Sequence, residues 1–537
     1  MRGHTPVLIA GGGPVGLALA AELGWRGIRC TLLEQGDGTI VSPKMNEVNT
    51  RTMEICRRWG IADWVMNCPF PGDFPLDAVF VTSLFGHELG RVERPARDHQ
   101  VPEPASPYRL QACSQIWFDP MLLKFARSFP SVTIRHKHRL ESFAHEPDGV
   151  TAEITDLASG ERYTLNADYL VGCDGVASLV RRGLGIELTG KGTIGHPLNL
   201  FFRAPDLLQR SGQKPATFFI PIDAGGAWAN LRIIDPVRGI WRLMIDHAGE
   251  DVTPDNADRQ GYLRRALGRD IDVEWIDVTV WRRRSLVAER YGEGRVWLAG
   301  DAVHQLSPTG ALGMNSGVGD AVDLGWKLAA AIEGWGGPHL VPSYDAERRP
   351  VGARNVRMAT GFYQNNEAFS QWSPAVLDDT PEGERARIEL GAALERGIGG
   401  EFRTLGLQIG YAYENSPICV TDGTPPLPDD PANYVPNARP GARAPHVWLR
   451  EGHSTLDLFG RGFVLMRFDG GAPIEPIVQA AAARRVPLTV HTIASRDAAA
   501  LYARKLALVR PDGHMAWRGD EPPSDPGHLL DTVRGAR

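Results

Sequence analysis

The residues with the clearest chemical potential form a glycine-rich turn near the start of the sequence. Residues 11–16 read Gly-Gly-Gly-Pro-Val-Gly, which fits the pattern Gly-x-Gly-x-x-Gly. Gly11 permits a sharp turn, Gly13 has no Cβ to block a pyrophosphate, and Gly16 allows a helix to approach a strand closely. An acid about 20 residues later can accept hydrogen bonds from ribose hydroxyls. The sequence therefore predicts a dinucleotide site made by Gly11, Gly13, Pro14, Val15, Gly16, Glu34 and Gln35.

Two later stretches place an aspartate directly after an apolar run. Asp174 follows Tyr169–Cys173, and Asp301 follows 296–299. Ligands of open α/β sheets collect at the carboxyl ends of strands, so both carboxylates are candidates for ligand contact. The alternative for Asp174 is capping of the helix that follows it. After Asp301 we expect a helix near Met314, whose free N–H groups would stabilise the negative charge of a reduced isoalloxazine ring.

These residues need a strand, helix and strand to position them, and the pattern around the glycines supplies all three. Apolar runs at 7–10 and 29–33 flank a helical stretch that continues through Trp25. Residues 185–285 are dominated by β-like runs, with helical signal mostly at 255–267, which indicates an antiparallel sheet that could wall off a pocket. Residues 421–446 hold seven prolines, and the tail alternates strand and helix.

This organisation predicts four regions along the chain. The regions are a discontinuous nucleotide-binding domain at 1–75, 105–182 and 286–395, a β-sheet substrate domain at 76–104 and 183–285, a linker at 396–446 and a small α/β domain at 447–537.

Composition narrows the function classes further. The chain has 537 residues and a formal net charge of −6, which gives no electrostatic reason to expect nucleic acid or an anionic membrane as a partner. No apolar run approaches the ~18–20 residues of a membrane span, and the few residues before the first strand leave no room for a signal peptide. Six cysteines without a Cys-x-x-Cys pair indicate a reduced, cytoplasmic enzyme.

Together the motifs resemble those of the single-component FAD-dependent aromatic hydroxylases. The stretches that carry the resemblance are 11–16, Cys173-Asp174-Gly175 to Arg181, and Gly300-Asp301-Ala302 through Asn315. Residues 343–348 and 439–449 resemble the branch of phenol hydroxylase and 2-hydroxybiphenyl 3-monooxygenase. The resemblance implies an α/β fold with a Rossmann-type, glutathione-reductase-like FAD domain, an antiparallel-sheet substrate domain and a thioredoxin-like C-terminal domain.

The resemblance also assigns roles to particular residues. It implies that the glycine turn and Glu34 hold the ADP half of FAD, and that Asp174 serves both FAD and the nicotinamide. The residues implied for the remaining FAD contacts are Lys44, which stands where relatives often carry Arg, Arg109, Gln115, Asp301, Pro308, Gly313, Met314 and Asn315.

The implied reaction uses NADPH or NADH and O₂ to hydroxylate a small phenolic or heteroaromatic substrate through a flavin C4a-hydroperoxide. A phenolate needs a nearby cation or base. Arg232 is the candidate for steadying it, and the alternative is a solvated sheet face. Phe218, Phe219 and Trp228 are candidates for an apolar pocket, whereas His304 is expected to be a structural hydrogen-bonder.

Other functions stay open at this point. Baeyer–Villiger or epoxidising oxygenation of a polycyclic or polyketide substrate uses the same scaffold, and a non-catalytic FAD-fold carrier is a third reading. No metal site is expected. The sequence leaves the substrate, the choice of NADPH or NADH and the oligomeric state open, with a homodimer as one option.

Overall fold

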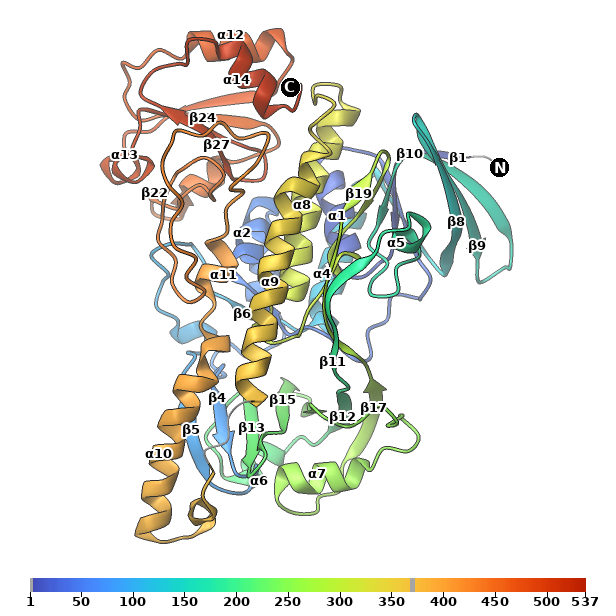
Figure 1. Cartoon of the computed structure of the whole chain (residues 1–537), viewed down its shortest axis with the longest axis vertical. Coiled ribbons are helices and arrows are strands. Elements are labelled where there is room, and N and C mark those ends of the chain that lie inside the picture. The colour runs from blue at the N-terminus through green and yellow to red at the C-terminus, as the bar shows by residue number, and fades with distance from the viewer. Residues whose placement is uncertain (1–2, 368–371) are drawn as a thin grey trace.

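The computed structural model describes residues 3–367 and 372–537 and places them in three stacked parts (Figure 1). A parallel sheet with its helices lies in the middle, a large mostly antiparallel sheet lies at one end, and the C-terminal residues lie at the other. Across the described residues, no helix combines the length and apolar character needed to cross a membrane. The same residues contain no cluster of metal-ligating side chains.

The parallel sheet brings the predicted motifs to one edge. Its five parallel strands, in spatial order, are β7 (Val132–His136), β2 (Cys30–Glu34), β1 (Gly3–Ala10), β10 (Arg162–Gly172) and β20 (Val296–Leu298). Ala10 lies opposite both Leu33 and Gly172, so these strands end at one level. Its antiparallel strands are β19 (Gly292–Glu293), which pairs with β20, and the hairpin of β8 (His138–Glu146) and β9 (Gly149–Asp156), which pairs with β10. The turns after β1, β10 and β20 therefore meet.

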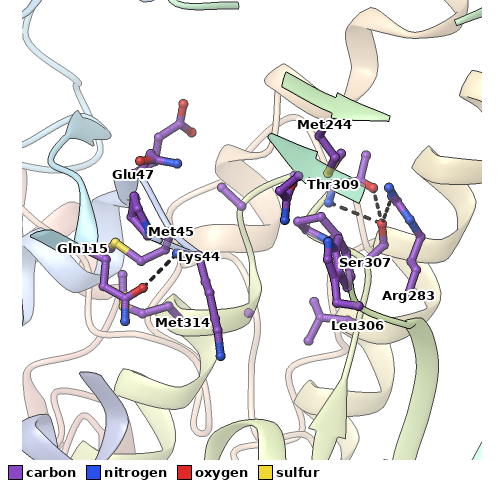
Figure 2. Close-up of a pocket in the computed structure, with 18 of the residues that line it drawn as sticks. Lys44, Met45, Glu47, Gln115, Met244, Arg283, Leu306, Ser307, Thr309 and Met314 are labelled. Carbon is purple, nitrogen blue, oxygen red and sulfur yellow. Dashed lines mark hydrogen bonds between the residues drawn. The ribbon is translucent and has the colours of Figure 1, made fainter. Parts of the chain in front are cut away.

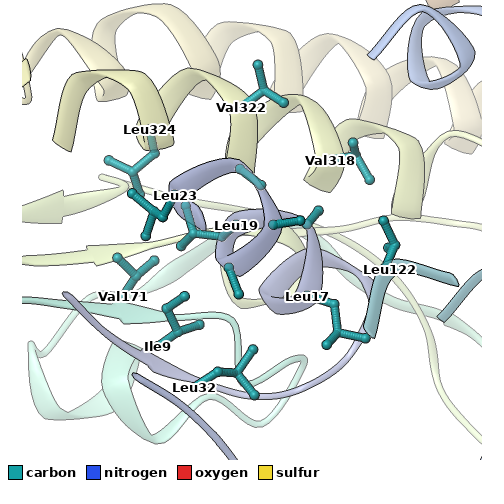
Figure 3. Close-up of a cluster of buried hydrophobic side chains, with 14 of the residues drawn as sticks. Ile9, Leu17, Leu19, Leu23, Leu32, Leu122, Val171, Val318, Val322 and Leu324 are labelled. Carbon is teal, nitrogen blue, oxygen red and sulfur yellow. The ribbon is translucent and has the colours of Figure 1, made fainter. Parts of the chain in front are cut away.

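Helix α1 (Pro14–Arg26) fills the space between this sheet and α8 (Gly313–Ile332) (Figure 3). Leu19 and Leu23 are completely buried in that layer. Gly24 keeps the layer thin, because a Cβ there would lie 2.6 Å from the Val132 side chain. The neighbouring helices are α2 (Thr50–Trp59), α3 (Ala62–Met66), α4 (Gln115–Arg127), α5 (Leu179–Gly183) and α9 (Ser343–Glu367).

The large sheet forms the lower part of the molecule in Figure 1. Its strands, in spatial order, are β17 (Glu274–Val280), β12 (Leu198–Arg203), β16 (Ile240–Ile245), β15 (Ala229–Asp235), β13 (Phe218–Asp223), β4 (Ala78–Val81) and β5 (Glu88–Val92), with β14 (Gly226–Ala227) beside β13. All neighbours are antiparallel except β13 and β4. The helices around it are α6 (Leu207–Ser211), α7 (Arg259–Leu267) and α10 (Pro381–Gly397). Helix α7 begins later than the predicted 255–267, because Asp258 caps it by accepting a hydrogen bond from Gly261 N at 2.8 Å.

Short strands connect the two large sheets. These are β3 (Glu47–Val48) paired with β6 (Gln111–Ala112), and β18 (Arg283–Ala288) between β11 (Leu188–Gly195) and β21 (His304–Gln305).

The C-terminal part is a four-stranded sheet with helices. Its elements are β24 (Phe463–Arg467), β25 (Leu488–Thr492), β26 (Leu506–Val509), β27 (Met515–Gly519), α12 (Glu475–Ala483), α13 (Arg496–Tyr502) and α14 (Pro526–Val533). It is preceded by α11 (Leu405–Ile409), β22 (Trp448–Arg450) and β23 (His453–Ser454). Its core is shared with the central part, because Trp326 of α8 packs against Phe463.

A buried cluster of charges fastens this part to the centre. Arg510, completely buried, donates to Asp323 of α8 at 3.0 Å and to Glu347 of α9 at 2.9 Å. Within the stretch predicted as a linker, Arg443 is buried and forms an ion pair with Glu54 of α2. The C-terminal part is therefore joined to the centre by buried ion pairs as well as apolar packing.

Candidate functional site

One cavity of about 790 Å³ runs from the edge of the parallel sheet, past the start of α8, to the large sheet. Figure 2 shows Gln115 of α4, Met314 at the start of α8 and Met244 of the large sheet around this cavity. The predicted residues that line it are Gly13, Pro14, Val15, Lys44, Gln115, Arg232, Asp301, Pro308, Gly313, Met314 and Asn315. The fold thus gathers residues as far apart in the sequence as Gly13 and Asn315 around one cavity.

The glycine turn has a different constraint at each glycine. Gly11 has φ of +106°, and a Cβ there would lie 2.3 Å from the Cys173 carbonyl oxygen. A Cβ on Gly16 would lie 2.0 Å from the Gly11 carbonyl oxygen. A Cβ on Gly13 would meet no protein atom within 4 Å, and no side chain caps α1 there. The open space above Gly13 faces unpaired helix N–H groups, which is the arrangement that binds a phosphate.

Glu34 lies at the end of β2, directly beside the glycine turn. Its Oε2 accepts a hydrogen bond from Gly12 N at 2.7 Å, and its Oε1 accepts one from Gly36 N at 2.6 Å. Each carboxylate oxygen retains a lone pair for a ribose hydroxyl. Gln35 is exposed.

Asp174 and Asp301 take different positions at this edge. Asp174 does not line the cavity; its Oδ2 accepts from Val180 N at 3.1 Å, beside the helix cap that Ser178 makes for α5. Asp301 faces the cavity and is accessible from it; the surrounding protein desolvates the carboxyl and raises its pKa, and the nearby His304 and Lys44 offset part of that rise. Asp301 is therefore the carboxylate available to a ligand in the cavity.

A buried network behind Asp301 holds this turn in place. Asp320 Oδ2 accepts from Gly300 N at 3.1 Å and lies 2.8 Å from His304 Nε2. Its Oδ1 accepts from Arg348 Nε at 2.8 Å. Burial alone would raise the pKa of Asp320, but Arg348 and His304 outweigh it and hold that pKa at about 2. His304 has the structural role expected from the sequence.

Lys44 and Gln115 lie together at one side of the cavity (Figure 2). Gln115 Oε1 accepts from Lys44 N at 2.9 Å, and its amide nitrogen donates to Asp119 at 2.9 Å. Burial raises the pKa of Asp119 to about 7. Arg109 is not brought to the cavity: its side chain is 39% exposed, donates to Val101 O and lies 3.4 Å from Glu103.

The start of α8 is tied to strand β3 by Asn315. The Asn315 side chain accepts from Asn49 N at 3.0 Å and donates to Glu47 O at 3.1 Å. No side chain caps the helix, so N–H groups at Gly313 and Met314 stay available for a ligand. The positive end of this 20-residue helix favours negative charge in the cavity.

Arg232 lies on the cavity face of the large sheet and is only 6% exposed, which excludes the solvated-face alternative. Its guanidinium donates to Glu47 at 3.0 Å and lies 4.0 Å from the centre of the Phe218 ring. Phe218 lines the cavity, but Phe219 and Trp228 do not. Successive residues of a strand point to opposite faces, and Phe219 packs into the core beneath the sheet, where Trp228 also packs.

Several residues of the site were not foreseen. They are Glu47, Arg94, Phe201, Arg242, Met244 and Arg283. Arg283 donates to Ser307 at 2.8 Å (Figure 2). Arg283 also forms an ion pair with Asp246. The available signal was an arginine inside an apolar strand, as with Arg242 between Trp241 and Leu243. Such a residue points either to solvent or into a polar cavity, and the sequence alone does not distinguish the two.

These residues fit FAD. The space above Gly13 takes a phosphate, Glu34 lies where a ribose would follow, and the bare start of α8 suits a ring that gains negative charge.

Comparisons with known proteins agree with this fit. The model of the FAD binding domain matches residues 4–359, and the model of the aromatic-ring hydroxylase C-terminal domain matches residues 437–536. Tetracenomycin B2 monooxygenase-dioxygenase of Streptomyces olivaceus is 32% identical, over 99% of this chain and 98% of its own. The rebeccamycin biosynthetic enzyme RebC with reduced flavin is 40% identical, with a TM-score of 0.92 and complete coverage of both chains. Aklavinone-11 hydroxylase with FAD and aklavinone is 30% identical, with a TM-score of 0.82 and complete coverage of both. The predicted fold class is confirmed.

Proposed function

The chain belongs to the single-component FAD-dependent aromatic-ring hydroxylases, and we propose that it hydroxylates a fused-ring aromatic substrate held between α8 and the large sheet. The enzyme is an FAD-dependent monooxygenase that uses NAD(P)H and O₂. The observation that supports the substrate class is the single cavity of about 790 Å³, which joins the cofactor-binding edge to a face of the large sheet. Relatives named tetracenomycin B2 monooxygenase-dioxygenase, aklavinone-11 hydroxylase and putative polyketide hydroxylase support a substrate of that kind.

Bound FAD supplies the redox chemistry, taking electrons from NADPH or NADH and activating O₂. For this chain we assign Gly13 and the start of α1 to the pyrophosphate, and Asp301 and Lys44 to the middle of the cofactor. The N–H groups of Gly313 and Met314 stabilise negative charge on the ring. Gln115 orients the Lys44 backbone, as its hydrogen bond of 2.9 Å to Lys44 N indicates.

The large sheet supplies the substrate side. Phe201, Phe218 and Met244 give an apolar surface that can contact an aromatic ring and keep water away from it. Arg232, fixed by Glu47 and Phe218, is placed to stabilise an oxyanion of the substrate. We keep Arg232 as the candidate catalytic residue on that basis.

The location and assembly of the enzyme stay predictions. All six cysteines are free thiols, which supports a reducing compartment and hence the cytoplasm. For the assembly, a homodimer stays one option.

The test is turnover of fused-ring phenols by the purified holoenzyme. We expect at least one compound among 1-naphthol, 2-naphthol, a hydroxyanthracene and the hydroxynaphthoic acids to accelerate NADPH or NADH oxidation and to gain one oxygen atom on a ring carbon, seen by mass spectrometry and NMR. A ring-expanded lactone or an epoxide would favour the alternative oxygenations instead. Failure of all of these compounds to accelerate coenzyme oxidation would contradict the proposed substrate class.

A further inference from the structure

A row of four side chains crosses the cavity face of the large sheet. Phe218 of β13 lies opposite Arg232 of β15, Arg232 lies opposite Arg242 of β16, and Arg242 lies opposite Phe201 of β12. All four line the cavity. Two arginines directly opposite each other on neighbouring strands repel one another, which destabilises a sheet unless negative charge is near.

The two arginines are not neutralised equally. Glu47 lies 3.0 Å from Arg232, but it is shared with Arg94 at 3.1 Å. Arg242 donates to the neutral Asn230 side chain at 2.9 Å, and within the described residues no carboxylate lies within ion-pair distance of it. Arg242 is 8% exposed, and its Nε has no hydrogen-bond partner in the described parts of the chain. The sheet thus holds one buried guanidinium without its own counter-ion.

The pKa of Arg242 reflects this missing negative charge. Burial, together with the positive charge of Arg232, lowers the pKa of Arg242 to about 9. Nearby Asp246 opposes the shift, but Asp246 is engaged in an ion pair with Arg283. A buried unpaired charge is costly, so an anion placed here would gain an unusually favourable contact.

The phosphates of FAD do not account for this charge. The phosphate-binding space lies above Gly13 at the start of α1, in the central part of the molecule, whereas β15 lies in the lower part in Figure 1. The two arginines instead lie on the face assigned to the substrate.

We propose that the substrate carries a carboxylate that binds between Arg232 and Arg242, so that the enzyme acts on an aromatic acid. The inference rests on the proposed function, because it concerns the substrate side of the same cavity. A guanidinium presents two parallel N–H groups that match a carboxylate, and contact of the Arg232 guanidinium with the Phe218 ring restricts its motion. The flanking rings of Phe218 and Phe201 contact the aromatic body of the acid, and Arg242 determines the specificity for the anion.

The experiment compares charged and neutral probes of equal shape. Purified holoenzyme, without NADPH or NADH, is titrated with benzoate, 2-naphthoate and anthracene-2-carboxylate and with the corresponding amides, and binding is followed by the change in flavin absorbance. We expect at least one acid to bind roughly 10-fold or more tightly than its amide, the effect of a charge-assisted hydrogen bond. Arg242→Met should remove this preference, and Arg242→Lys should retain part of it.

The matched control is Arg238→Met in the turn of the same hairpin, where the side chain is 68% exposed. This variant should keep the full preference for the acid. The inference is overturned if no acid binds better than its amide, or if Arg242→Met, loaded with FAD as the wild type is, keeps the preference. This experiment measures binding and no turnover, so its result can be interpreted even if the proposed hydroxylation is not observed.

Discussion

Replacing Gly13 with alanine should separate cofactor binding from folding. The backbone at Gly13 has φ of −71°, which alanine adopts, and the new Cβ would meet no protein atom. We expect the apoprotein to lose about 1 kcal/mol of stability or less, the usual effect of alanine at a helix N-cap. The Cβ would instead occupy the space of the pyrophosphate. Loss of one charge-assisted hydrogen bond costs about 1.5–3 kcal/mol, which raises the dissociation constant of FAD roughly 10- to 150-fold.

Gly16→Ala is the matched comparison, because its Cβ would lie 2.0 Å from the Gly11 carbonyl oxygen. That clash should lower the stability of the apoprotein itself. The assay is titration of each apoprotein with FAD by fluorescence quenching, together with thermal unfolding followed by circular dichroism. Wild-type affinity for FAD in Gly13→Ala, or equal destabilisation by both substitutions, would refute this account of the turn.

Three further predictions concern other parts of the molecule. The Asp119 carboxyl keeps its proton up to a pH of about 7 in the folded protein, whereas the unfolded chain releases it near the usual pKa of about 3.9. The free energy of unfolding should therefore fall by up to about 1.4 kcal/mol per pH unit as the pH rises between these values. Asp119→Asn should flatten that slope in urea unfolding. Arg510→Met removes one of the two buried cations that pair with Asp323 and Glu347, leaving only Lys327, and should cost about 3–5 kcal/mol in urea unfolding. Arg504→Met, at a side chain 41% exposed, should change little. Arg109→Ala should leave the affinity for FAD within twofold of the wild type, and a loss of tenfold would show that Arg109 does reach the cofactor.

The features that could be predicted from the sequence are those that depend on residues close together along the chain. The glycine turn, the strands beside it and the helix after Asp301 are local patterns, and the structure places them as expected, with α8 beginning at Gly313. The position of Arg109 could not be predicted in this way, because its contacts come from the loop around Val101 and Glu103, which carries no regular sequence pattern.

The substrate side depended on contacts between distant residues. Glu47 and Arg232 are 185 residues apart, and no local signal pairs them. Choosing between Phe218 and Phe219 required knowing which face of β13 packs on the core, and either choice fits the alternation of a strand. Arg242 became informative only once the strand opposite it was known to carry Arg232.

The shared charge cluster limits how this enzyme can be recombined with its relatives. Arg510 belongs to the C-terminal part, while its acceptors Asp323 and Glu347 belong to helices of the cofactor-binding part. A chimera that imports only a foreign tail would leave Asp323 and Glu347 with Lys327 as their one remaining buried cation, unless the foreign tail brings its own guanidinium. In recombined enzymes, function should therefore be preserved when α8, α9 and the C-terminal part all come from the same parent sequence.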